Sequence, residues 1–182
     1  MVYVFLAEGF EEIEALTPVD ILRRAGVETR TVAVGTAGRE VTGSHGITVS
    51  ADLQTDGVST EGLEAIVLPG GMPGTRNLEQ DETVQKLIDF CVEREKWIGA
   101  ICAAPSILGH KGLLEGRRAT AYPTFMQELG GASLSDDYVC RDGHIITARG
   151  MGVSVPFALK LAEVLVSPEK AEEIEAGIQW EG

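Results

Sequence analysis

Short apolar segments alternate with helical patterns from one end of this sequence to the other, and this alternation constrains the fold more than any other feature. The apolar segments predict strands at Val2–Leu6, Thr29–Val34, Ala65–Leu68, Ile98–Ile101 and, as a short strand, Arg118–Ala121. Strands that alternate with helices favour a mainly parallel central sheet with helices on both faces. The sequence therefore predicts an α/β fold.

The segments between these strands predict helices and two hairpins. The expected helices are Glu11–Ala25, Asp81–Glu95, Pro105 to about Lys111, Val155–Val166 and Pro168–Ala176. Glycines within Val41–Val49 indicate a strand or hairpin there. A second hairpin is expected to pair Tyr138–Cys140 with His144–Thr147, because the Arg141-Asp142-Gly143 sequence between them favours a turn.

Length and charge restrict the class of protein. The 182 residues suit a single domain, 1–182, with one substantial core. A formal net charge of -13 argues against a nucleic-acid partner and against binding to an anionic membrane surface. No apolar run approaches the ~20 residues that cross a bilayer, and the first residues lack the positive charge of a signal peptide. Three cysteines without paired spacing favour a reducing, cytoplasmic location.

The segment from Ile98 to Pro105 predicts a strand that ends on Cys102 and turns at once into a helix. Gly99, Ala100, Ala103 and Ala104 leave room for a sharp turn, and Pro105 suits the first turn of a helix. A thiol at this position meets unpaired backbone N–H groups and the positive end of the helix dipole, which favour the thiolate. Cys102 is therefore either a catalytic nucleophile, presented on a sharp strand-to-helix turn known as a nucleophile elbow, or one more small buried core residue.

Three features follow the carboxyl ends of expected strands, where ligands sit in such folds. Cys102 follows one strand and the pair Gly70 and Gly71 follows another, while an acidic segment with Glu14 follows the first. Glu14 lies among apolar neighbours and is either a surface glutamate, which composition favours, or a buried carboxyl, whose raised pKa would suit it to proton transfer. The other acidic residues of this segment are expected to be solvated. The paired glycines form either an oxyanion site or an ordinary loop.

Other common sites are missing from the sequence. There is no dinucleotide fingerprint and no phosphate-binding loop, so we expect no nucleotide cofactor. The cysteine spacing indicates no structural metal. His110, two turns along the helix from Cys102, is too distant to touch the sulfur. The sequence thus predicts neither a cofactor nor a metal.

The ordered set of motifs resembles the ThiJ/PfpI superfamily, and within it the Parkinsonism-associated deglycase branch with the bacterial YajL-like proteins. The matching segments are Glu11 to Glu14, Pro18 to Asp20, Arg23 to Gly26, Leu68 to Gly71, Ala100 to Pro105 and Thr147 to Gly150. Together they cover nearly the whole chain. The resemblance implies a flavodoxin-like sandwich that forms a homodimer with its reactive cysteine near the interface.

The resemblance also implies roles for individual residues. Cys102 would be the nucleophile and the oxidation-sensitive thiol, and Glu14 a buried, protonated carboxyl bonded to it. Gly71 and Ala103 would be oxyanion donors through their backbone N–H groups. Arg24 matches an arginine that lies near the partner's site in the dimer.

Three residues depart from the pattern of the family. Tyr122 stands where many members have a histidine, so a Cys–His dyad is not expected. His45 stands where close relatives tend to have arginine near the interface, which would make an anion site there dependent on pH. Met151 replaces a proline, which we interpret as a structural change.

The expected function is a cofactor-independent enzyme that acts on small dicarbonyls. Cys102 would add to the aldehyde of methylglyoxal or glyoxal, and Glu14 would move a proton between adjacent carbons before hydrolysis. The same chemistry could act on early glycation adducts, which would make the protein a deglycase. The alternative is a redox-responsive or chaperone-like stress protein with an oxidisable Cys102 and little turnover. An intracellular cysteine peptidase or amidase is a third hypothesis, which Tyr122 weakens.

Overall fold

The first strand occupies the middle of the fold and shows how the core is divided. In this computed structural model, which describes residues 1–180, β1 (Val2–Ala7) is buried along its whole length. Because successive side chains of a strand point to opposite faces, Val2, Val4 and Leu6 join one apolar cluster and the residues between them join another. Two cores therefore form, one on each face of the sheet.

The central sheet has seven strands in the order β10-β11-β7-β6-β1-β2-β5. They are β2 (Thr29–Val34), β5 (Leu53–Gln54), β6 (Ala65–Leu68), β7 (Trp97–Ile101), β10 (Val139–Asp142) and β11 (Ile145–Ala148), beside β1. All neighbours are parallel except β10, which pairs antiparallel with β11. The predicted parallel sheet is confirmed. β6, β1 and β7 are adjacent, so their carboxyl ends lie at one edge.

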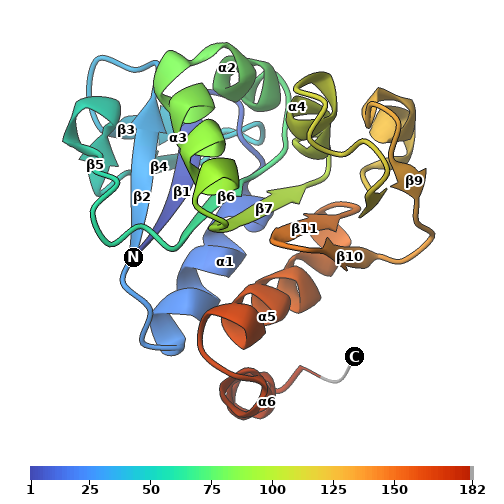
Figure 1. The fold of residues 1–182 in the computed structure, drawn as a ribbon. Coiled ribbons are helices and arrows are strands. Elements are labelled where there is room, and N and C mark those ends of the chain that lie inside the picture. Colours follow the sequence, from blue (N-terminus) through green and yellow to red (C-terminus); the bar gives the residue numbers. More distant parts are fainter. Residues whose placement is uncertain (181–182) are drawn as a thin grey trace.

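Helices cover both faces of this sheet (Figure 1). One face carries α1 (Glu12–Arg24), α5 (Ser154–Leu165) and α6 (Pro168–Gly177), whose buried residues belong to the first cluster. The other face carries α2 (Gly74–Gln80), α3 (Glu82–Glu93) and α4 (Pro105–His110), which contribute to the second cluster. The predicted helices are confirmed, whereas α2 had not been expected as a separate helix.

Smaller elements surround the sheet. The predicted hairpin at Val41–Val49 is β3 (Glu40–Thr42) paired antiparallel with β4 (Thr48–Ser50). The expected strand at Arg118–Ala121 is shorter, since β8 (Arg118–Ala119) pairs with β9 (Ser133–Leu134) outside the main sheet. Short 3₁₀ helices occupy Thr55–Gly57, Pro123–Glu128 and Met151–Val153.

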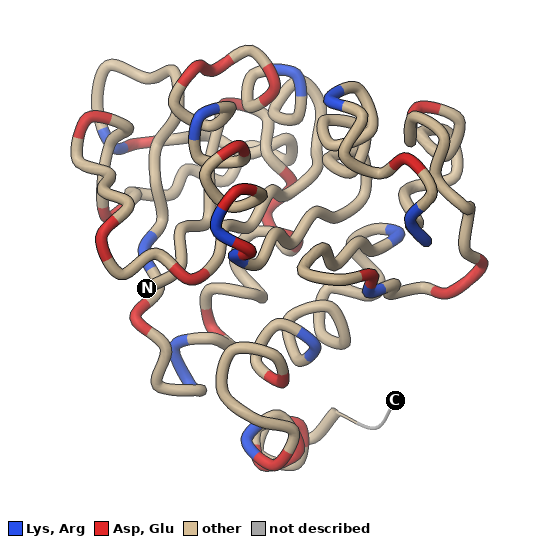
Figure 2. Tube along the Cα trace, in the orientation of Figure 1, with Lys and Arg blue, Asp and Glu red and all other residues tan. Residues whose placement is uncertain are grey.

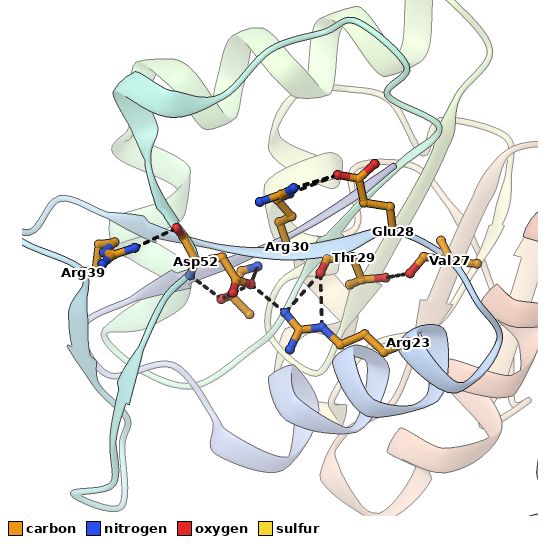
Figure 3. Close-up of polar contacts among 8 residues, drawn as sticks. Arg23, Val27, Glu28, Thr29, Arg30, Arg39 and Asp52 are labelled. Carbon is orange, nitrogen blue, oxygen red and sulfur yellow. Dashed lines mark hydrogen bonds and ion pairs between the residues drawn. The ribbon is translucent and has the colours of Figure 1, made fainter.

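A partly exposed polar network fastens the short edge strand β5 to the rest of the fold. Figure 3 shows Asp52 between Arg23 of α1 and β2. The Asp52 carboxylate accepts hydrogen bonds from the Arg23 guanidinium at 2.6 Å and from the backbone N–H of Thr31 at 2.8 Å. Burial raises the pKa of Asp52, but the bonds from Thr31 and Arg23 outweigh this effect and lower it. We interpret this network as structural.

Charged residues are spread along the whole trace, with acidic residues in excess (Figure 2). Among the described residues, none of the helices is both long and apolar enough to cross a membrane.

The close packing of α5 on the sheet gives a stability prediction. Phe157 is fully buried, and a Cβ added to Gly99 of β7 would lie 3.0 Å from its ring. We expect Phe157→Ala to lower the free energy of unfolding by about 3–5 kcal/mol, because it removes buried apolar area and leaves a cavity. Urea denaturation measures this change. Val166→Ala, at the exposed end of the same helix, should change it by less than about 0.5 kcal/mol.

Candidate active site

Cys102 lies on a sharp turn between β7 and α4. Its backbone has φ 65°, a left-handed conformation that is rare for residues other than glycine. Its N–H donates to the carbonyl of Ala148 at 2.8 Å, and its carbonyl accepts from Tyr122 N–H at 2.8 Å. Pro105 begins α4, as predicted. Neighbouring segments thus hold the turn, and the Cys102 side chain is partly exposed.

Glu14 reaches this cysteine from the first turn of α1. It is 1% exposed, so the burial that the family resemblance implied is confirmed and the surface position that composition favoured is wrong. Its carboxyl is hydrogen-bonded to the Cys102 side chain and accepts the backbone N–H of Gly70 at 2.9 Å and that of Met151. Glu11 caps the helix, since its carboxylate accepts the Glu14 N–H at 2.7 Å. The sequence did not reveal the contributions of Met151 and Glu11.

The glycine loop after β6 closes the other side of the site. The backbone N–H groups of Gly71 and Ala103 are hydrogen-bonded to the Cys102 sulfur. Gly70 had been grouped with them as an oxyanion donor, but its N–H is directed to Glu14 instead. A Cβ on Gly70 would lie 2.6 Å from a Glu14 oxygen and 2.7 Å from Cys102 Cβ, so only glycine fits here.

The electrostatics of the pair differ from our expectation for the thiol. Burial raises the pKa of Glu14 to about 7, and the negative charge of Glu11 adds to this effect. Burial also raises the pKa of Cys102 to about 12, and the Glu14 carboxylate beside it acts in the same direction. The N–H groups of Ala103 and Gly71 favour the thiolate, as predicted, but burial and Glu14 outweigh them. The thiol therefore needs a base, and Glu14 is in contact with it.

Two exposed side chains lie close to the cysteine. Gly150 lies between Tyr122 and Cys102. A Cβ atom added to Gly150 would be 3.4 Å from the Tyr122 ring and 3.9 Å from the Cys102 sulfur. Met151 follows Gly150 and is 53% exposed, and Tyr122 is 47% exposed. Tyr122 is thus placed where a ligand on the sulfur would meet it.

His45 lies beside this site rather than in it. Its backbone N–H and its Nδ1 contact the two carboxylate oxygens of Glu12 at 2.7 and 2.8 Å, and Glu11 lies 3.9 Å away. Glu12 is 2% exposed, so our expectation that it is solvated was wrong. The hairpin of β3 and β4 folds over it and supplies its hydrogen bonds. The sequence predicted no metal site. Among residues 1–180, the side chains of Glu11, Glu12 and His45 form one group whose possible ligand atoms lie within 4.8 Å of one another, which is close enough to hold an ion.

The His45–Glu12 contact predicts a pH-dependent contribution to stability. The hydrogen bond and charge of Glu12 raise the pKa of His45 above its ordinary 6.5. Burial raises the pKa of Glu12, but its bonds from His45 outweigh burial and lower it below 4.5. The stabilisation is thus complete between pH 4.5 and 6.5 and is lost as pH rises through the raised pKa of His45.

We therefore expect His45→Gln to lower the melting temperature most between pH 4.5 and 6.5, and progressively less at alkaline pH. Thermal denaturation of both proteins across this range measures the difference. A difference that does not change with pH would contradict the prediction.

The remaining predicted residues lie elsewhere. Arg24 lies at the other end of α1 from Glu14, about 15 Å along the helix, and pairs with Asp20 at 2.6 Å. His110 bonds Glu79 at 2.6 Å rather than approaching the sulfur, as expected. Cys91 and Cys140 are buried, free thiols outside this site.

Comparisons of the sequence and of the structure with known proteins identify the family of this chain. The profile of the DJ-1/PfpI family matches residues 1–164. Protein dj-1beta of Drosophila melanogaster is 36% identical over 96% of this chain and 94% of its own. The glutathione-independent glyoxalase DJR-1.2 of Caenorhabditis elegans is 31% identical over 92% of this chain and 89% of its own. The oxidized DJ-1 structure of Toxoplasma gondii superposes with a TM-score of 0.95, at 36% identity, and covers 100% of this chain and 98% of its own. The chain therefore belongs to the DJ-1/PfpI family.

Proposed function

We propose that this protein is a cofactor-independent glyoxalase that converts methylglyoxal or glyoxal to the corresponding hydroxy acid, with the same chemistry available for early glycation adducts. One observation carries the proposal: a partly exposed thiol is hydrogen-bonded to a buried carboxyl whose pKa is about 7. A base with a pKa near the working pH is well suited to proton transfer. The glyoxalase relative from Caenorhabditis elegans supports the same reaction class.

The reaction needs one nucleophile, one base and one water. Glu14 takes the thiol proton while the Cys102 sulfur attacks the aldehyde carbon, and it then gives this proton to the aldehyde oxygen, which completes a hemithioacetal and restores the Glu14 carboxylate. The N–H groups of Gly71 and Ala103, which face the sulfur, stabilise negative charge that develops beside it. Glu14 then moves the proton from the former aldehyde carbon to the adjacent carbon, and the hydroxyl proton passes from the former aldehyde oxygen to the ketone oxygen, which gives a thioester. Water cleaves the thioester to release lactate and restore the thiol.

Product identification tests this proposal most directly. Purified protein incubated with methylglyoxal should form lactate, measured by NMR, in an amount that exceeds the amount of protein many times. The product must be followed because thiols and amines also trap the aldehyde reversibly. Aldehyde that disappears without lactate, and returns on dialysis, would contradict the proposal.

A second candidate function is redox sensing, with or without a chaperone-like role. It is favoured by the partial exposure of Cys102 and by the N–H groups of Gly71 and Ala103, which could also bind the oxygens of a sulfinate. Intact-protein mass spectrometry after mild peroxide should find two added oxygen atoms in the wild type and none in Cys102→Ser. Equal uptake by both proteins would exclude Cys102 as the sensor.

We also propose that the chain forms a homodimer in a reducing, cytoplasmic location. Ile13 and Ile47, 47% and 55% exposed, belong to α1 and the adjoining hairpin turn and offer apolar area to a second copy. Arg24 could then approach the partner's site although it is distant from its own. The free state of all three cysteines supports a reducing compartment. Light scattering should give twice the mass of 19.4 kDa.

A further inference from the structure

A cavity lies at the end of the sheet opposite Cys102. It has a volume of about 390 Å³ and is bounded by the end of α3, the starts of β7 and β11, and the loop after α4. Ile98, at this end of β7, is four strand residues from Cys102, or about 13 Å. The volume is within the range of small-molecule sites. The cavity is therefore separate from the site described above.

The floor of this cavity is apolar. Cys91 and Ile98 are buried, and Leu113 and Ile145 complete the lining. Cys91 belongs to the second core cluster, and burial raises the pKa of its thiol to about 12, so it remains an uncharged apolar group. An occupant would need an apolar body to displace water from this surface.

The rim carries cationic and hydrogen-bonding groups whose hydrogen-bonding capacity is only partly used within residues 1–180. The Arg117 guanidinium forms an ion pair with Asp142, 3.5 Å away, but no side-chain hydrogen bond among these residues. The His144 ring likewise has no hydrogen-bond partner among these residues and packs on Trp97, with the centroids 4.8 Å apart. Lys96 bonds both oxygens of Glu64, at 3.0 and 3.1 Å, so its charge is balanced.

We infer that this cavity binds a small carboxylate with an apolar body, such as an arylcarboxylate. The apolar part would contact Ile98 and Leu113, and the carboxylate would accept two hydrogen bonds from the planar Arg117 guanidinium. Glu95 lines the cavity, and Asp142 lies 3.5 Å from the Arg117 guanidinium. These two carboxylates disfavour a dianion more than a monoanion, so the expected ligand carries a single charge. This inference does not depend on the proposed function.

Benzoate is a suitable probe, and benzamide is its neutral control. In a ¹⁵N-correlated NMR titration of the whole chain, benzoate should shift amides of residues 91–98, 113–117 and 143–145, with benzamide binding more weakly. Arg117→Gln should weaken benzoate binding by about tenfold or more, since a hydrogen bond to a charged group contributes at least about 1.5 kcal/mol. Leu113→Trp should abolish it by filling the cavity.

Arg30→Gln is the matched control because Arg30 is an exposed arginine on β2, paired with Glu28, and its loss should leave binding unchanged. Two results would overturn the inference: no shifts at the cavity amides at any soluble benzoate concentration, or equal binding by Arg117→Gln and the wild type. If Leu113→Trp fails to fold, Arg117→Gln decides alone.

Discussion

Replacing Cys102 by serine is expected to lower lactate formation from methylglyoxal by about a thousandfold or more, because a serine hydroxyl is far harder to ionise beside Glu14 than a thiol. The fold should be preserved, since the turn is held by backbone bonds to Ala148 and Tyr122 that do not involve the side chain. Initial rates of lactate formation and a urea titration measure the two effects.

Cys140→Ser is the matched control for this substitution. Cys140 is buried, unlike the partly exposed Cys102, and its thiol is hydrogen-bonded to Ser135, which could bond a hydroxyl equally well. We expect this variant to keep its activity. If Cys102→Ser formed lactate at the rate of the wild type, the sulfur would not be the nucleophile, and the proposed reaction would be wrong.

Glu14→Gln is expected to remove activity and, at the same time, to relieve the folded state of a buried charge. The wild-type rate should rise with pH through about 7, as Glu14 becomes a free base. The variant should lose this limb of the pH profile, with a rate lower by about a hundredfold or more. A variant that kept both the rate and the limb would exclude Glu14 as the base.

Stability should change in the opposite sense. The pKa of Glu14 is raised from 4.5 to about 7 by folding, so the folded wild type loses stability as pH rises between these values. This loss amounts to about 3 kcal/mol, from about 1.4 kcal/mol for each pKa unit. The amide does not titrate, so the free energy of unfolding of Glu14→Gln, relative to wild type, should increase by that amount between pH 4 and 8. Urea titrations at both pH values measure it.

The position of the site could be predicted from the sequence because the residues suited to catalysis follow strands that are neighbours in the sheet. Cys102, Gly71 and Glu14 each follow a buried strand, and parallel neighbours bring those carboxyl ends together. The positions of these residues needed only short patterns, each of them local to one strand and its following loop. The burial of Glu14 was implied by the resemblance to the family, because composition alone favoured a surface position.

Contacts between distant segments could not be predicted in the same way. The burial of Glu12 depends on a hairpin some thirty residues later, whose turn places His45 against it. The Met151 N–H reaches Glu14 from the other end of the chain. The thiol pKa was expected to fall because only the local turn was considered, whereas burial and Glu14 decide its direction. The short strand β5 carries too few apolar residues to form a recognisable pattern.

The two outer strands of the main sheet also influence how the protein behaves at high concentration. An exposed strand edge offers unpaired N–H and C=O groups to other chains, which is a route to aggregation. Here one edge strand, β5, is only two residues long, and the other, β10, carries Arg141 and Asp142. Short and charged edges are poor templates for strand addition. The sheet therefore ends in a way that disfavours open-ended fibrous association of the folded protein.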